Sequence, residues 1–418
     1  MLGALRHQFE RIVQEGNLMV TVPDGTDWLF GDGTGPSVHV AINDRRAMRS
    51  LLLDPDLALG ERYMDGGLSM LSGTIHDFLT LLFRNMEHAA SLPLTVTLPY
   101  ALRIALKRLH QRNAPTNARR NIVHHYDLSG ALYDLFLDRE RQYSCAYFEH
   151  PDATLEEAQL AKMRHIAAKL AIEPGMRVLD IGCGWGGLAL YLSEVCGANV
   201  IGITLSDEQL SYATDRAQAR LNRDVEFRLM DYREIDGSFD RIVSVGMFEH
   251  VGVSHFGDYF RQVKRLLKPD GVALIHSICR IDGPGATSAW TKKYIFPGGY
   301  IPALSEVVPH IEREGLITTD VEILRLHYAE TLKNWRERFD LNRHRARALY
   351  DERFCRMWEF YLSSSECAFR FGSMANMQIQ IVRDRNVLPL TRTYMQDEED
   401  RLRALDSRRR HLRSVKHS

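Results

Sequence analysis

The chain has 418 residues, of which 45% are hydrophobic and 26% charged, a composition typical of a globular protein. This length is too great for one compact core and predicts two domains. The 53 basic residues are balanced by 54 acidic ones, and the resulting net charge of −1 argues against a nucleic-acid-binding protein. The six cysteines form no CxxC pair, which disfavours a zinc site or a disulfide scaffold and suits a reducing cytosol.

The first sixteen residues carry acidic side chains and lack a long apolar core, so they do not resemble a secretory signal. No apolar run is long enough to span a bilayer. We therefore expect a cytoplasmic protein that could reach lipid only from the membrane surface.

Residues 1–110 are predicted to form a smaller α+β N-terminal domain. Residues 18–22 and 38–41 have the apolar pattern of strands, and residues 74–83 that of a helix. Residues 54–67 (DPDLALGERYMDGG) are rich in turn formers around a short helical core.

Residues 88–126 contain no Asp or Glu, and residues 99–109 (PYALRIALKRL) alternate apolar and basic positions at helical spacing. This pattern fits a solvated helix that leads into a linker at 111–123. It fits equally a basic surface that binds anionic phospholipid. A second basic run, 401–418, is interpreted as a frayed tail rather than a membrane anchor.

The pattern changes near residue 150 to a regular alternation of strands and helices. Strands are predicted at 176–181, 199–204, 225–230, 239–245, 272–278, 317–326 and 377–382, with helices at 154–170, after the glycine-rich turn to 196, from 206, and at 255–267. Such alternation predicts a seven-stranded, doubly wound α/β sheet whose ligand lies outside the carboxyl ends of the strands.

The first of these strands ends in a glycine-rich turn, 178–187 (VLDIGCGWGG). Gly182, Gly184 and Gly187 satisfy the GxGxxG pattern of dinucleotide sites. Asp180, however, would repel a pyrophosphate seated on the next helix, and the second strand ends without the acid that a dinucleotide ribose requires. A tight turn without any ligand is the structural alternative.

The DxGxG pattern resembles motif I of class I methyltransferases, in which the glycines let the backbone approach the amino-acid part of S-adenosylmethionine. Many of those enzymes have an acid at the end of the second strand. This chain offers Thr204 and Gln209 there instead, and contact of these two side chains with the ribose is our hypothesis.

Several further segments, in the same order along the chain, resemble the cyclopropane-fatty-acyl-phospholipid synthases and the related mycolic acid cyclopropane synthases. The resemblance runs from about residue 120 to the end, and more weakly into 59–66 (LGERYMDG). Its segments are 125–128 (HYDL), 143–148 (YSCAYF), 180–187, 202–209, 231–233 (DYR), 240–252 (DRIVSVGMFEHVG), 276–278 (HSI), 293–302 (KYIFPGGYIP) and 327–332 (HYAETL).

The resemblance implies a set of residues that bind S-adenosylmethionine. They are Tyr143, Ser144, Asp180, Gly182, Cys183, Gly184, Thr204, Leu205, Ser206, Gln209, Asp231, Tyr232 and Arg233. The last two stand where the mycolic acid enzymes typically have Trp-Glu, so Arg233 departs from the family pattern.

The resemblance also implies a bicarbonate ion held by Cys145, Glu249, His276, the main chain of Ile278, and Tyr328. Methylation of a double bond leaves a carbocation, and ring closure then requires a base within reach of the new methyl group. The pocket must otherwise exclude water. Cys145, His276 and Tyr328 could instead be packing or structural residues. A buried Glu249 would be costly without a partner, which favours function.

The expected protein is thus a class I S-adenosylmethionine-dependent methyltransferase with a catalytic domain at 124–418. It would convert unsaturated phospholipid acyl chains to cyclopropanes at the inner membrane surface, as a possible homodimer. Three alternatives remain open. They are a methyl- or methylene-branching fatty acid methyltransferase, a non-catalytic lipid-binding protein, and a methyltransferase for a small metabolite.

Overall fold

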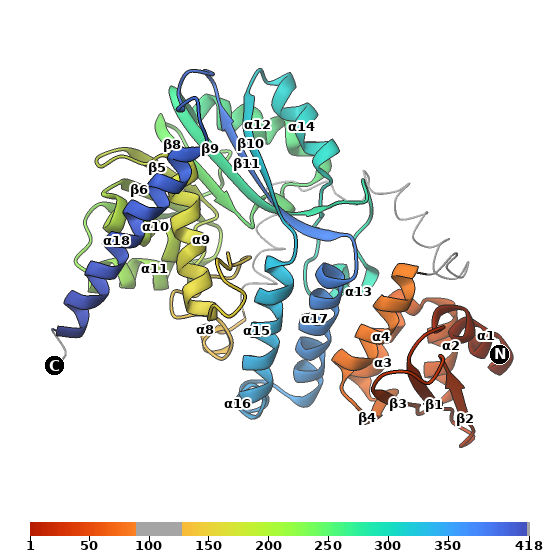
Figure 1. Cartoon of the computed structure of the whole chain (residues 1–418). Helices are drawn as coiled ribbons and strands as arrows, with labels where there is room; N and C mark the ends of the chain where they lie inside the picture. The colour runs from red at the N-terminus through yellow and green to blue at the C-terminus, as the bar shows by residue number, and fades with distance from the viewer. Residues whose placement is uncertain (89–127, 416–418) are drawn as a thin grey trace. The chain divides into compact units, whose positions relative to one another are not determined.

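The computed structural model describes residues 1–88 and 128–415 (Figure 1). The predicted basic helix, the linker at 111–123 and residues 125–127 lie outside the described residues. Packing divides the chain into two compact units. Unit 1 comprises Met1–His110, Gly285–Pro297 and Ala329–Met374, and unit 2 comprises Gln111–Pro284, Gly298–Tyr328 and Ala375–Ser418.

Unit 1 contains a four-stranded sheet in the order β2-β1-β3-β4. Its strands are β1 (Asn17–Thr21), β2 (Asp27–Phe30), β3 (Ser37–Ile42) and β4 (Leu68–Ser72). Alternate side chains such as Leu18 and Val20, or Trp28 and Phe30, are buried, which is the pattern of a sheet covered on one face. The predicted strands at 18–22 and 38–41 match β1 and β3. Sequence patterning missed β2 and β4, which are short.

Polar side chains cap several helices of unit 1. Its helices among the described residues are α1 (Leu2–Ile12), α2 (Arg45–Leu53), α3 (Pro55–Asp65), α4 (Ile75–His88), α13 (Ala289–Tyr294), α16 (Arg343–Leu349) and α17 (Glu352–Arg370), together with most of α15 (His327–Leu341). The Asp54 carboxylate accepts a hydrogen bond from Leu57 N at the start of α3, and Gly66 ends that helix with a φ of 78°. These caps explain the turn-rich composition of residues 54–67.

The first segment of unit 1 ends at residue 110, as the predicted N-terminal domain does, but the unit also contains later parts of the chain. Two segments of the expected catalytic domain, Gly285–Pro297 and Ala329–Met374, pack with the N-terminal residues instead. Trp290 of α13 lies directly over Gly60 of α3, and the Tyr63 hydroxyl donates a 2.9 Å hydrogen bond to Glu359 on α17. The LGERYMDG segment therefore serves as a docking face for later parts of the chain, a long-range arrangement that local patterning does not predict.

Unit 2 contains a seven-stranded sheet in the order β10-β11-β9-β8-β5-β6-β7. Its strands are β5 (Arg177–Ile181), β6 (Asn199–Thr204), β7 (Val225–Leu229), β8 (Phe239–Val245), β9 (Leu267–Arg280), β10 (Ile317–Leu324) and β11 (Met374–Val382). The five strands β5 to β9 are parallel where they pair, and β10 is antiparallel to β11. All seven strands predicted after residue 170 are confirmed, and the doubly wound α/β fold with them.

Helices cover both faces of this sheet (Figure 1). One apolar core joins the sheet to α9 (Leu155–Leu170), α10 (Gly187–Cys196) and α18 (Thr393–Val415), and the other joins it to α12 (Phe256–Leu266) and α14 (Leu304–Arg313). The described part of the unit also contains the short α8 (Gly130–Tyr133) and α11 (Asp207–Ala219). Neighbouring residues of β5 point to opposite cores, Val178 to one and Leu179 to the other, as strands buried on both faces require.

Most of the basic run predicted to be a frayed tail is helical, because α18 continues to Val415, and residues 416–418 lie outside the described residues. Helix α18 packs on α9 through Leu402, and the Arg164 guanidinium donates to Asp406 at 3.0 Å. These contacts order a segment whose composition alone indicates disorder. Among the described residues, no helix has the length and hydrophobicity needed to cross a membrane.

We predict that Gly60→Ala lowers the thermal unfolding midpoint, because its new Cβ would lie 2.3 Å from Trp290 Nε1. Overpacking of this kind costs about 1–3 kcal/mol. Gly3→Ala, in helix α1, is the matched control: its Cβ meets no atom within 4 Å, and alanine favours the helix. Thermal unfolding of both variants measures the difference, and equal midpoints would contradict the packing argument.

Candidate functional site

A cleft opens at the carboxyl ends of β5, β6 and β8, where a doubly wound sheet binds its ligand. It is formed within unit 2. Of the residues predicted to bind the cofactor, those that line it are Tyr143, Ser144, Asp180, Gly182, Cys183, Gly184, Thr204, Leu205, Gln209, Asp231, Tyr232 and Arg233. The fold thus gathers twelve residues from four separate segments on one surface.

The glycine loop forms the floor of this cleft. Gly182 has a φ of 81°, and a Cβ at this position would lie 2.9 Å from Met247 Cβ. Gly184 has a φ of 53°, also in the left-handed region, with open space beside it. The first glycine is needed for a close approach and the second for the turn itself, which leaves the backbone of the loop exposed toward the cleft.

The Asp180 carboxyl is buried at the end of β5, with only 1% of the residue exposed. No described residue forms a hydrogen bond with its Oδ2 atom. Burial raises the pKa of Asp180 to about 7, while the positive charge of Lys162 acts in the opposite direction. A carboxyl in this situation is stabilised by a cation or a donor from a ligand.

Ser206, by contrast, is not among the residues that line the cleft, and its side chain has a structural role. Its Oγ accepts a hydrogen bond from Gln209 N at 3.3 Å and caps the start of α11. The Thr204 hydroxyl donates to Gln209 Oε1 at 2.8 Å, so these two side chains are held together at the edge of the cleft. That hydrogen bond is consistent with the hypothesis that Thr204 and Gln209 contact the ribose.

Arg233, which departs from the family pattern, is fixed by its neighbour. The guanidinium donates to both oxygens of Asp231, at 2.8 Å from Nε and 2.5 Å from Nη2. It also lies 5.5 Å from the ring of Tyr232. The cleft therefore contains an Asp231–Arg233 ion pair whose two charges compensate each other.

Other residues that line the cleft were not predicted from the sequence as binding residues. They are Arg141, Gln142, Trp185, Leu188, Ile181, Ile203, Met230, Val245, Gly246, Met247, His250 and Val251. Arg141 has a φ of 49° and donates to both oxygens of Asp134, and its guanidinium lies 3.9 Å from the Tyr212 ring centre. Burial lowers the pKa of His250 to about 4, so its imidazole is neutral. Position at a strand end was the available signal for 245–247.

Two members of the predicted anion cage are joined directly. Glu249 lies in a short 3-10 helix after β8, and its Oε1 accepts a hydrogen bond from Ile278 N at 2.7 Å. Its Oε2 is buried without a hydrogen-bond partner among the described residues. Burial raises the pKa of Glu249 to about 7. The carboxyl is therefore poised to share a proton with a group that reaches Oε2.

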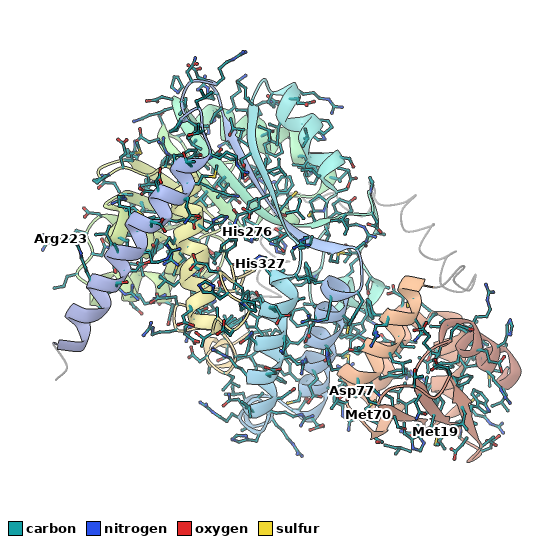
Figure 2. All side chains as sticks on the ribbon, viewed as in Figure 1. Met19, Met70, Asp77, Arg223, His276 and His327 are labelled. Carbon is teal, nitrogen blue, oxygen red and sulfur yellow. The ribbon has the colours of Figure 1, made fainter. Side chains whose placement is uncertain are left out.

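His276 lies on β9 in the sheet of unit 2 (Figure 2), and both of its ring nitrogens are bonded to β11. Nε2 lies 2.9 Å from Asn376 Nδ2, and Nδ1 lies 3.1 Å from Gln378 Nε2. Burial lowers the pKa of His276 well below 6.5, so the ring is neutral. Because a neutral imidazole accepts at one nitrogen only, one of the two amides must present its oxygen to the ring. This differs from the expectation that the His276 side chain faces a ligand.

The main chain of His276 nevertheless lies beside the cleft. Its carbonyl accepts a hydrogen bond from Gly246 N at 2.9 Å, and Gly246 lines the cleft. Cys145 and Tyr328 are both buried in the same unit. The Cys145 thiol directs its hydrogen toward the Ala146 carbonyl at 3.3 Å.

The residues that line the cleft fit S-adenosylmethionine. Its α-ammonium group matches the buried, unpartnered Asp180 oxygen, and the open backbone of the glycine loop suits its amino-acid part. The sheet order, the glycine loop and the buried carboxyl define a class I S-adenosylmethionine-dependent methyltransferase.

Comparisons with known proteins give the family. Residues 113–379 match the family described as mycolic acid cyclopropane synthetase, and residues 4–91 match a domain of unknown function. The cyclopropane-fatty-acyl-phospholipid synthase of Escherichia coli is 38% identical over 376 residues, which cover 86% of this chain and 94% of that one. A probable fatty acid methyltransferase of Pseudomonas putida is 40% identical over 301 residues, 69% of this chain and 76% of the relative. The chain belongs to the mycolic acid cyclopropane synthetase family.

Solved structures agree with this assignment. The cyclopropane synthase MmaA2 of Mycobacterium tuberculosis has a TM-score of 0.60 and 34% identity, and it covers 63% of this chain and 97% of its own. The mycolic acid cyclopropane synthase CmaA1, solved as a complex with SAH and CTAB, has a TM-score of 0.60 and 35% identity over the same shares.

We predict that, without cofactor, Asp180→Asn unfolds at a higher temperature than the wild type at pH 8 but not at pH 4. The native pKa of Asp180 is raised to about 7 from an ordinary value of 3.8. Its ionisation therefore weakens the native state progressively as the pH rises from about 4 to about 7, and asparagine lacks this effect. Thermal unfolding across this pH range measures it.

Asp236→Asn is the control, because the Asp236 side chain is 84% exposed. A pH dependence that appears in Asp180→Asn and not in this exposed variant would come from the buried Asp180 carboxyl. A constant difference for Asp180→Asn would show that the Asp180 carboxyl is not desolvated in the native state.

Proposed function

We propose that this protein transfers a methyl group from S-adenosylmethionine to the cis double bond of an unsaturated phospholipid acyl chain and closes a cyclopropane ring. The observation that carries the proposal is the pair of buried, half-satisfied carboxyls, Asp180 and Glu249, at the carboxyl edge of one sheet. The name of the E. coli relative, which matches across nearly its whole length, supports a phospholipid substrate.

The chain's own residues would bind and orient the methyl donor. Asp180 would accept hydrogen bonds from its α-ammonium, the Gly182–Gly184 backbone would contact its amino-acid part, and Thr204 with Gln209 would hold the ribose. Tyr143, Ser144, Leu205, Asp231, Tyr232 and Arg233 would complete the walls. When bound, the donor supplies an electrophilic sulfonium methyl group next to a cleft with Met230, Met247 and Val251 in its wall. An apolar wall excludes water that would otherwise trap a carbocation on the acyl chain.

Ring closure requires a base, and we propose that Cys145, Glu249, His276, Ile278 and Tyr328 hold a bicarbonate ion for this purpose. The free Oε2 of Glu249 supports this, since a carboxyl with a pKa of about 7 can bond to a bicarbonate hydroxyl and set which oxygen faces the cation. For the His276 ring to reach the ion, one of its amide partners on β11 must turn away. Asn376 and Gln378 would thereby set the ring's tautomer.

A branching reaction is the alternative outcome. After methyl transfer, a hydride shift before proton loss leaves a methyl or methylene branch instead of a ring. Two relatives are named as methyltransferases and not as cyclopropane synthases, which keeps this alternative open. They are the probable fatty acid methyltransferase of P. putida and the tuberculostearic acid methyltransferase of M. tuberculosis, which is 35% identical over 381 residues.

The N-terminal residues 1–110 are proposed to interact with lipid, so that the enzyme works as a peripheral protein at the inner membrane surface, and we propose that it forms a homodimer. The match of residues 4–91 to a separate domain is consistent with a role distinct from methyl transfer.

The proposal predicts the product made from vesicles of oleoyl phospholipid and S-adenosylmethionine. We expect the acyl mass to increase by one methylene, with cyclopropane protons upfield in the NMR spectrum. A branch methyl signal would instead establish the branching alternative. No release of S-adenosylhomocysteine with unsaturated vesicles would overturn the proposal, and saturated vesicles are the control.

We predict that Glu249→Gln lowers kcat by about 100-fold or more, as expected for loss of an acid–base group, with little change in the affinity for S-adenosylhomocysteine. Tyr328→Phe should act in the same direction. Turnover and calorimetric binding measure the two quantities. Glu226→Gln, at a side chain that is 58% exposed, is the control. Equal losses of turnover and cofactor affinity would contradict a role after docking.

A further inference from the structure

Helix α9 carries a buried polar face behind the cofactor cleft. The helix begins with a capping box, in which Thr154 and Glu157 bond to each other's backbone. Gln159 and Lys162, one turn apart on α9, are completely buried. Burying a lysine costs several kcal/mol unless its charge is compensated, so the position of Lys162 requires an explanation.

These two side chains hold the segment that forms one wall of the cleft. The Lys162 ammonium donates to Gln142 Oε1, and to Ser144 Oγ at 2.9 Å. The Gln159 amide donates to the carbonyls of Ser144 at 3.0 Å and Gln142 at 3.3 Å. Because residues 141–144 line the cleft, α9 fixes this wall from behind.

The charge of Lys162 is not balanced by an ion pair. Both of its hydrogen-bond acceptors are neutral, and no carboxylate of the described residues lies within 4.0 Å of its Nζ atom. Burial lowers the pKa of Lys162 to about 8, while the more distant acidic groups of Asp138 and Asp180 act in the opposite direction. The Lys162 ammonium behind the wall that carries Ser144 therefore has no directly paired carboxylate among the described residues.

Lys169, two turns further along α9, is a buried lysine that does form ion pairs with carboxylates of the protein. It is equally buried, but its Nζ lies 2.5 Å from Glu322 and 3.4 Å from Asp320. The charge of Lys169 is balanced by protein groups, whereas that of Lys162 is left for something else to balance.

We propose that Lys162 is a positioning residue for S-adenosylmethionine, whose α-carboxylate supplies the missing negative charge through the Gln142–Ser144 wall. Asp180, on the β5 side of the same cleft, provides the opposite charge for the α-ammonium. The zwitterionic end of the cofactor then lies between a buried cation and a buried acid. This inference depends on the cofactor binding in this cleft, as proposed above, and not on which lipid product forms.

The test compares two ligands that differ only in the carboxylate: S-adenosylhomocysteine and its decarboxylated analogue. Calorimetric titration of wild type and Lys162→Met should show about 10–100-fold weaker binding of S-adenosylhomocysteine to the variant, as expected for a hydrogen-bonded charge. The affinity for the decarboxylated analogue should stay the same within about twofold, a spread smaller than one neutral hydrogen bond.

Lys162→Gln keeps a hydrogen-bond donor without the charge, and gives the same comparison if methionine prevents folding. Lys169→Met is the matched control: it should lower the unfolding temperature and leave both affinities unchanged. If the variant loses affinity equally for both ligands, Lys162 has only a structural role and the proposal is wrong. An unchanged affinity for S-adenosylhomocysteine would also overturn the proposal. Neither result depends on turnover, so failure of the proposed lipid chemistry is detected separately.

Discussion

The site depends on charged groups kept out of water at the carboxyl edge of a parallel sheet. Asp180 and Glu249 each have one buried oxygen without a protein partner, and burial raises the pKa of each to about 7. Lys162 lies behind them with neutral partners only. Such groups weaken an empty protein, so their retention is understood through ligands that complete them.

The rest of unit 2 holds this unfavourable arrangement in place. The two apolar cores clamp β5 and β8 from both faces, so the ends of these strands cannot relax toward solvent. The 138–144 segment is fixed in turn by Asp138, whose carboxylate accepts from Gln142 N at 2.8 Å and from Glu140 N at 2.9 Å. Because its surroundings are rigid, the polar groups of the cleft are already oriented toward the ligand position before a ligand binds. This lowers the free-energy cost of reorganisation on binding.

The proposed anion site differs from the cleft proposed for the cofactor in how much of it is already formed. The cofactor residues line one open cleft, whereas Ile278 N is bonded to Glu249 and the His276 ring to two amides of β11. An ion that binds there exchanges protein hydrogen bonds for its own instead of filling an open space. Binding of the proposed bicarbonate base would then require a local rearrangement of these hydrogen bonds, during which the Glu249 carboxyl would stay in place.

The sequence by itself determined the seven strands of unit 2, the left-handed turn at Gly182 and Gly184, and the gathering of Asp180, Thr204 and Asp231 at one edge, because these follow from local periodicity and strand direction. Tertiary structure alone decided the partners from distant segments. Asn376 and Gln378 form hydrogen bonds with the His276 ring. Gln142 and Ser144 accept hydrogen bonds from the Lys162 ammonium. Trp290 packs on Gly60. Such contacts join residues 18 to 230 positions apart, and no local pattern encodes which buried polar group meets which.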